Sequence, residues 1–254
     1  MFPLKDDIPT RRFPILTVAI IAICAVVYFG FEHGGLGLGN YGNTRVVEYG
    51  AIPYEITHPG KDCGISGDRV ECPSSDATGN APAWLTVLTS MFMHGSLLHL
   101  AGNMLFLWVF GNNIEDSMGR PRFVLFYLLG GVAALAGQTL IDPDATAPTV
   151  GASGAIAAVL GGYALLYPRA RVVTVVFIIF FFTILNLPAL AVLGLWFLMQ
   201  VAYGATQIAE PVGGSGGVAY FAHIGGFLFG LLLIKLFANR VHDDYDRSRR
   251  LPVY

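Results

Sequence analysis

Six long stretches of the chain contain no aspartate, glutamate, lysine or arginine, and this feature constrains the fold more than any other. Each stretch is close to or above the roughly 20 apolar residues that a helix needs to cross a bilayer. The stretches are Phe13–Phe31, Ala77–Ile114, Phe123–Ile141, Ala145–Pro168, Val172–Ala209 and Pro211–Ile234. Only 13% of the residues are charged, whereas soluble domains have about 25%. The sequence therefore predicts an all-α membrane protein with six transmembrane helices.

Two of these stretches are too long for a single crossing. In the first, we place the span at about Ser96–Asn112, and an interfacial segment at Trp84–Met93 leads into it. In the second, Pro188 interrupts a continuous helix. We therefore expect a shallow or re-entrant piece over Val172–Phe182 and the main part of the fifth crossing over Ala189–Tyr203. A seventh crossing in this stretch stays open as an alternative.

The basic residues are sorted by side. With six spans both termini lie on one side, and twelve of the fifteen lysines and arginines lie there too. Because basic loops favour the cytoplasmic side, we expect both termini in the cytoplasm, and we expect the cell (plasma) membrane as the location. The chain then divides into a cytoplasmic segment 1–12, a membrane domain 13–237 with an external loop at about 32–83, and a cytoplasmic tail 238–254. A net charge of −2 and the lack of a basic patch argue against a nucleic-acid partner.

The external loop contains two cysteines, Cys63 and Cys72. They could form a disulfide if the loop faces an oxidising compartment. A metal site that combines them with His58 matches no common zinc spacing, and we expect no metal.

Ionisable and polar groups inside spans are costly, so each one is a functional hypothesis. Ser153 opens the fourth span within Gly151-Ala152-Ser153-Gly154. It could simply cap the helix, but the flanking glycines let another backbone come close to the hydroxyl. His223 lies in the first part of the sixth span, so the two side chains can lie at a similar depth. A serine and a histidine on packed helices are the minimum for nucleophilic catalysis.

Close packing of these two helices is itself predicted by small residues. Gly226 and Gly230 form a small-xxx-small face on the sixth span, and the fourth span offers small residues such as Ala158 and Gly161.

The second span adds further polar residues. His99 and Asn103 are spaced i, i+4 and share one helical face, so both can donate hydrogen bonds to an oxyanion. The alternative is that they bond neighbouring helices together. Gln138 and Gln200 are the other notable polar residues in the spans. No span contains a carboxylate, which argues against ion transport and leaves a dyad rather than a triad.

Taken in order along the chain, these motifs resemble the rhomboid family of intramembrane serine proteases. The resemblance covers about Trp84 to Phe237. It rests on four motifs: His94-x4-His99-x3-Asn103, Glu115-x3-Gly119-x2-Arg122-Phe123, Gly151-Ala152-Ser153-Gly154 and Ala222-His223-x2-Gly226-x3-Gly230.

The resemblance implies a six-helix bundle around a water-filled cavity that opens to the outer face, with the first loop partly in the outer leaflet. Ser153 would be the nucleophile and His223 the general base. His99, Asn103 and the Ser153 backbone N–H would form the oxyanion hole, and Gln138 could help to hold water. The fifth span would be a lateral gate for transmembrane protein substrates, and no cofactor is implied.

Two departures from the family pattern leave questions open. Some members place a tyrosine four residues after the nucleophile, where it packs on the histidine, but this chain has Ala157 there. An aromatic residue on another span could orient His223 instead. The Trp-Arg pair of the first loop in some members has no evident match. A catalytically silent relative that binds membrane clients, and a small transporter, are the rival interpretations.

Overall fold

The computed structural model describes residues 2–36, 44–67, 69–74, 80–178, 181–209 and 218–239 of the chain. We predicted a C-terminal tail at 238–254, and most of it, residues 240–254, lies outside the described residues.

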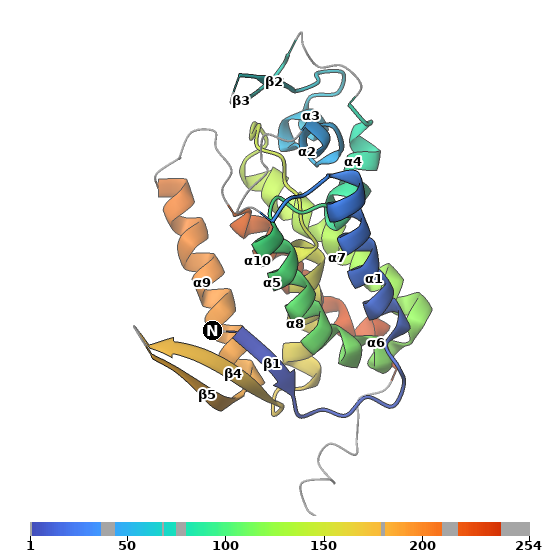
Figure 1. Ribbon diagram of the computed structural model, residues 1–254, viewed down its shortest axis with the longest axis vertical. Coiled ribbons are helices and arrows are strands. Elements are labelled where there is room, and N and C mark those ends of the chain that lie inside the picture. The colour runs from blue at the N-terminus through green and yellow to red at the C-terminus, as the bar shows by residue number, and fades with distance from the viewer. Residues whose placement is uncertain are drawn as a thin grey trace, which may run out of the picture.

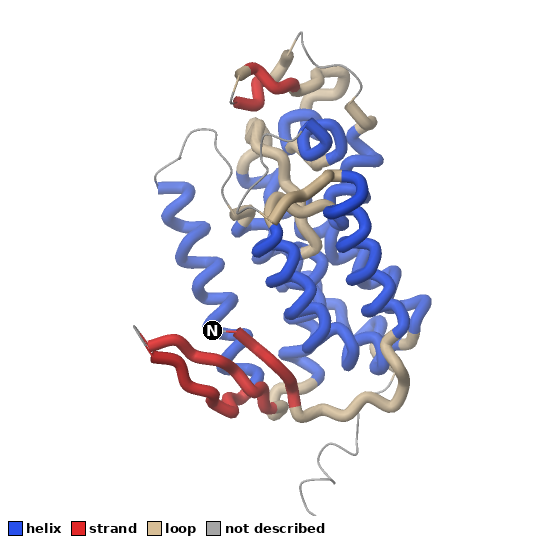
Figure 2. The backbone as a smooth tube through the Cα atoms, viewed as in Figure 1, coloured by secondary structure: helices blue, strands red, loops and turns tan. Residues whose placement is uncertain are grey.

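The molecule is mostly helical, and its long helices run roughly side by side (Figure 1, Figure 2). The helices of the bundle are α1 (Ile15–Val26) with its π-helical continuation η1 (Val27–Phe31), α5 (Leu97–Phe106) with η3 (Leu107–Gly111) and α6 (Asn112–Met118), α7 (Arg120–Ile141), α8 (Ser153–Leu166), α9 (Ala189–Ala209) and α10 (Tyr220–Phe237).

Four of the helices in the described residues are long and apolar enough to cross a membrane: Leu97–Met118, Arg120–Ile141, Ala189–Ile208 and Tyr220–Phe237. The helical segments at Ile15–Phe31 and Ser153–Leu166 are apolar but shorter. The chain is therefore a helical membrane protein with at least these four candidate spans, and the count of six stays a prediction.

The second span begins where we expected it and ends later. Ser96 caps α5, because its hydroxyl accepts the backbone N–H of His99 at 3.1 Å. The helix then continues past Asn112 to Met118. The extension contains Glu115, whose buried carboxylate accepts the backbone N–H of Thr17 at 2.8 Å and so caps α1. The charge-free stretch ends at Ile114, before this helix end, because the Glu115 carboxylate is hydrogen-bonded inside the protein.

The helix α8 lies at the centre of the bundle, and nearly all of its residues are buried. It packs closely against α10 through small residues. A Cβ atom on Gly226 would overlap the carbonyl oxygen of Gly154, and one on Gly230 would overlap that of Ala158. The small residue can also be on α8, since a Cβ atom on Gly161 would overlap the carbonyl oxygen of Phe227 in α10. The predicted small-residue contact between the fourth and sixth spans is confirmed.

The prediction of an all-α protein is wrong in one region. Strands β4 (Arg171–Ile178) and β5 (Phe181–Pro188) form an antiparallel hairpin, and β1 (Phe2–Asp6) pairs with β4 to give the order β1-β4-β5. We expected a shallow or re-entrant segment here. Valine, isoleucine, threonine and phenylalanine dominate both strands, and such residues favour a pleated surface. A continuous apolar run does not by itself distinguish a strand from a buried helix.

The described residues between the first two spans form a small unit, the loop unit, at one end of the bundle (Figure 1). We call this end of the bundle the loop end. The elements of the loop unit are α2 (Thr44–Tyr49), α3 (Pro53–Thr57), β2 (Gly64–Ser66), β3 (Arg69–Glu71), α4 (Ala83–Thr89) and η2 (Ser90–Phe92). The last two cover the expected lead-in segment Trp84–Met93 except for its final residue. The opposite end holds the first residues of α1 and α7 and the last residues of α8, and we call it the basic end.

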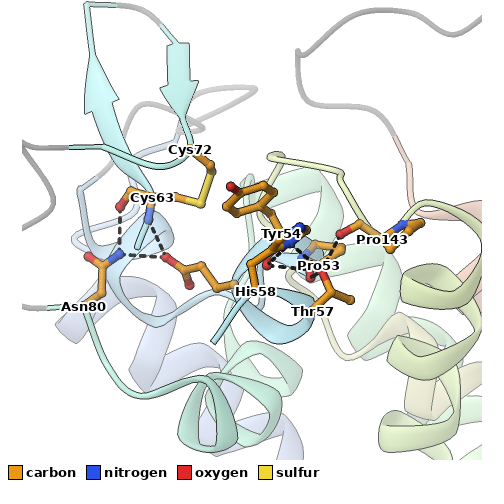
Figure 3. Close-up of a disulfide and its surroundings, with 9 residues drawn as sticks. Pro53, Tyr54, Thr57, His58, Cys63, Cys72, Asn80 and Pro143 are labelled. Carbon is orange, nitrogen blue, oxygen red and sulfur yellow. Dashed lines mark hydrogen bonds between the residues drawn. A yellow bond between two sulfur atoms is a disulfide. The ribbon is translucent and has the colours of Figure 1, made fainter. Parts of the chain in front are cut away.

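A disulfide joins Cys63 and Cys72 in this unit (Figure 3). The buried Glu55 carboxylate accepts the backbone N–H of Cys63 at 2.8 Å and the side-chain amide of Asn80 at 2.9 Å. Thr57 donates to the carbonyl oxygen of Pro143 at 2.7 Å, which ties the unit to the turn that follows α7. The loop is therefore a folded structure attached to the bundle.

Candidate active site

Ser153 is the first residue of α8, and its hydroxyl does not cap the helix. Residue 152 occupies the cap position, and Gly151 before it has a φ of +129°, a backbone conformation that favours glycine. Its N–H donates to the carbonyl oxygen of Ser90 at 2.9 Å, which anchors the turn before the helix. The simple capping role that we considered for Ser153 is wrong, and the hydroxyl is free for another partner.

That partner is His223, in the first turn of α10. The Ser153 Oγ atom lies 2.9 Å from His223 Nε2. The two residues are 70 positions apart in sequence, and the α8–α10 contact through glycines brings them together. The sequence-based expectation that they lie at a similar depth agrees with this geometry.

The other ring nitrogen of His223 faces α9. His223 Nδ1 lies 2.8 Å from Gln200 Oε1, and the Trp196 ring packs against the imidazole with centroids 5.7 Å apart. An aromatic residue on another span was expected here, but the contact with Gln200 was missed. The available signal was the position of Gln200 four residues after Trp196 in a helix that contains few other polar side chains.

His99 and Asn103 lie on α5, opposite the turn that precedes Ser153. The space beside Gly151 is filled by the His99 ring, since a Cβ atom on the glycine would lie 2.7 Å from His99 Cε1. The Asn103 side-chain nitrogen is buried and has no hydrogen-bond partner among the described residues. Because it has no partner among these residues, this amide nitrogen is available to an incoming acceptor. Such a contact would be favourable, since an unpaired buried donor is costly.

His94 lies behind His99. Its ring is fully buried, meets the His99 ring edge-on at 5.2 Å, and neither of its nitrogens has a partner among the described residues. Its backbone N–H donates to the Glu32 carboxylate at 3.1 Å. His94 therefore packs against His99 inside the protein.

A cavity of about 970 Å³ joins these groups. Its lining includes all four predicted site residues and Gln138, whose side-chain oxygen is buried without a partner among the described residues. The lining combines a hydroxyl, an imidazole and unpaired amides with apolar side chains such as Trp196 and Ile156. Irregular backbone that is exposed to lipid is not tolerated in the hydrocarbon region of a membrane. A cavity of this kind can instead hold both water and an extended peptide.

The fold and the site together define a helical membrane protein with a serine–histidine pair inside a polar cavity. Residues 81–240 match the rhomboid domain, and the chain belongs to the rhomboid family.

Named relatives agree with this membership. The chain is 31% identical to Rhomboid protein 1, mitochondrial, of Saccharomyces cerevisiae over 173 residues, 66% of this chain and 45% of the relative. It is 31% identical to the presenilin-associated rhomboid-like protein, mitochondrial, of Homo sapiens over 150 residues, 57% of this chain and 36% of the relative. It is 30% identical to the rhomboid protease GluP of Bacillus subtilis over 154 residues, 61% of this chain and 24% of the relative. The chain thus spans less than half the length of each.

The expectation of a plasma-membrane location is contradicted by these comparisons. The yeast and human relatives both carry mitochondrial names, and they point to a mitochondrial membrane instead. The error has a physical reason: the distribution of lysine and arginine distinguishes two sides of a membrane, but it does not identify the membrane.

Proposed function

We propose that this chain is an intramembrane serine protease that hydrolyses peptide bonds in or near the transmembrane helices of other membrane proteins. The observation that carries the proposal is the 2.9 Å approach of Ser153 Oγ to His223 Nε2 at the wall of a polar cavity. The naming of the Bacillus subtilis relative as a rhomboid protease supports it.

Ser153 acts as the nucleophile and His223 as the general base. Nε2 of His223 takes the hydroxyl proton as Oγ attacks the scissile carbonyl carbon. The resulting imidazolium returns the proton to the leaving amine as the C–N bond breaks. A water molecule then loses a proton to His223 and attacks the acyl carbon, which releases the carboxylate product and the Ser153 hydroxyl.

The developing oxyanion is stabilised by His99, Asn103 and the backbone N–H of Ser153. The Asn103 amide is buried and unpaired among the described residues, and the backbone N–H belongs to the first turn of a helix, where such groups have no intrahelical acceptor. Donors of this kind need little reorganisation when charge develops on the substrate oxygen. Gln138 is placed in the same cavity to help hold the hydrolytic water.

The length of α8 supports a reaction below the membrane surface. Its 14 residues span about 21 Å at 1.5 Å per residue, shorter than the ~30 Å hydrocarbon core. With its last residue at the basic-end interface, Ser153 lies roughly 10 Å inside the core at the loop end. Six spans, counting the shorter α1–η1 and α8, and a first loop that touches the lipid surface complete the proposed arrangement.

Substrate helices enter beside α9, which we propose as the lateral gate. Its lipid-side residues Leu190, Leu195 and Leu198 are exposed in the isolated chain. A substrate helix must locally unwind to present a carbonyl group, so helix-weakening residues near the loop end favour cleavage. No cofactor or metal takes part in the proposed reaction.

The test is cleavage of a single-span substrate by the protein reconstituted in liposomes. We expect Ser153→Ala and His223→Ala to produce no cleavage products while they keep the melting temperature of the wild type. Ser66→Ala, which changes a serine in the loop unit, should cleave like the wild type. Cleavage by Ser153→Ala at the wild-type rate would refute the proposal, and an inactive wild type would favour a silent relative that only binds clients.

A further inference from the structure

We propose that Gln200 is a positioning residue that fixes the tautomer and orientation of His223, so that the dyad is completed by a neutral third member. The inference rests on the proposed function of Ser153 and His223. It concerns α9, which lies next to α10 (Figure 1) and carries none of the site residues predicted from the sequence.

The orientation of the Gln200 amide is set by its two hydrogen-bond partners. Oxygen and nitrogen of such a group are told apart by their partners. The Gln200 nitrogen lies 3.3 Å from the backbone carbonyl oxygen of Trp196. That oxygen can only accept, so the nitrogen of the amide must face it. Gln200 Oε1 is then the atom that faces His223 Nδ1 at 2.8 Å.

The tautomer of the histidine follows from this orientation. Oε1 of Gln200 can only accept a hydrogen bond, so Nδ1 of His223 must carry the proton. A neutral imidazole has one donor and one acceptor nitrogen, and Nε2 is therefore the acceptor. Nε2 lies 2.9 Å from Ser153 Oγ, so the serine hydroxyl must be the donor. This is the arrangement in which the histidine can remove the serine proton.

Other contacts restrict the movement of the His223 ring but do not determine which of its nitrogens carries the proton. The Trp196 ring packs against the imidazole at a centroid distance of 5.7 Å, and His223 and Gln200 are both buried. An apolar ring limits rotation of the imidazole but does not select a protonated nitrogen. Among the described residues, Gln200 is the hydrogen-bond partner of Nδ1. It thus does for this pair what a buried aspartate does in a Ser-His-Asp triad, without a charge in the span.

Kinetics of three variants test this role. Gln200→Met keeps the side-chain length and removes the acceptor, and we expect kcat to fall on the order of 10²-fold with KM nearly unchanged. The loss is smaller than the ~10⁴-fold loss when a triad aspartate becomes asparagine, because methionine does not impose the wrong tautomer. Gln200→Glu restores an acceptor and should recover kcat to within about tenfold of the wild type. Asn186→Leu makes the same change from an amide to an apolar side chain on the exposed strand β5, away from the cavity lining, and should leave kcat unchanged.

A spectroscopic readout separates this inference from the proposed function. We expect the nitrogen spectrum of histidine-labelled wild-type protein, with His223 assigned by its loss in His223→Ala, to show the proton on Nδ1. Gln200→Met should give a mixture of tautomers. A proton on Nε2 in the wild type, or wild-type kcat in Gln200→Met, would overturn the inference even if Ser153→Ala is inactive. If Gln200→Met does not fold, the wild-type spectrum alone still decides.

Discussion

At the scale of single residues, the site depends on polar groups that have few hydrogen-bond partners. Ser153 and His223 have each other, and the Asn103 amide nitrogen has no partner among the described residues. An unpaired buried donor costs roughly 1–3 kcal/mol. Such a cost is offset only if the donor is used at some stage, which is the reason to place Asn103 at the oxyanion.

Replacement of this donor gives the first residue-scale prediction. Asn103→Ala should lower kcat on the order of 10²-fold, as loss of one oxyanion donor does elsewhere. It should leave KM nearly unchanged and should not lower the melting temperature, because the resting protein makes no hydrogen bond through the Asn103 nitrogen within the described residues. Steady-state cleavage in liposomes measures both constants. The matched control is Asn186→Ala on the exposed strand β5; equal turnover by the two variants would contradict the oxyanion role.

At the scale of elements, the dyad depends on how closely α8 and α10 approach. Glycine is required where the backbones meet, because a Cβ atom on Gly230 would overlap the carbonyl oxygen of Ala158. The same contact sets the separation of Ser153 and His223, which are near the first turns of the two helices. Packing and catalysis are therefore linked through one helix pair.

We expect Gly230→Ala to destabilise the protein by about 1–3 kcal/mol, the range for overpacked cores, and to reduce cleavage by shifting α10 away from α8. The matched control is Gly194→Ala on α9, where no atom lies within 4 Å of the added Cβ. It should keep full activity and lose no stability, since alanine favours a helix over glycine. Thermal unfolding in detergent and the cleavage assay check both variants. A Gly230→Ala protein as stable and active as Gly194→Ala would show that the helices have room to spare.

At the scale of the whole molecule, the N-terminal residues are joined to the bundle by a buried carboxylate. Asp6, in β1, accepts hydrogen bonds from the side chains of Asn113 at 2.6 Å and Tyr163 at 2.6 Å. The contacts connect the strand to α6 and α8. Burial raises the pKa of Asp6 from its ordinary value near 3.8 to about 6. The N-terminal segment, which we expected to lie in the cytoplasm, thus contacts the helices of the bundle through Asp6.

This pKa predicts how stability depends on pH. The folded protein binds the Asp6 proton more tightly than the unfolded chain, so the stability from this group is largest below pH 4 and decreases as pH rises to about 6. A shift of this size corresponds to at most roughly 3 kcal/mol, at about 1.4 kcal/mol per pKa unit. Asp6→Asn keeps an acceptor and cannot ionise. It should therefore unfold at a higher temperature than the wild type at pH 8, and at a similar temperature at pH 4.

Melting curves of both proteins over this range are the measurement, with Asp142→Asn, an exposed aspartate at the end of α7, as the control. A difference between Asp6→Asn and the wild type that is the same at pH 4 and pH 8 would contradict the account.

Much of this molecule could be predicted from the sequence, for identifiable reasons. Charge-free stretches located the long helices, because an unpaired charge in a lipid-facing helix is expensive. The motifs around Ser153 and His223 were informative as a set, since single residues such as a lone serine are ambiguous. The β-hairpin at 171–188 was missed, because an apolar run suits both a strand and a helix.

The role of Gln200 and the end of the second span were missed for a different reason. Both depend on contacts between residues far apart in sequence, Gln200 with His223 and Glu115 with Thr17. A sequence pattern along one helix contains no information about a partner on another. The family resemblance did not supply Gln200 either, and only the packed arrangement of α9 and α10 reveals the contact.

The central claim, that Ser153 is a nucleophile activated by His223, is tested most directly by a serine-reactive fluorophosphonate. Attack by the serine oxygen forms a P–O bond and releases fluoride, so the modified residue can be located by peptide mass spectrometry. We predict a single adduct on Ser153 that is absent from Ser153→Ala and strongly reduced in His223→Ala. Modification of another serine in place of Ser153, or undiminished labelling of Ser153 in His223→Ala, would contradict the claim.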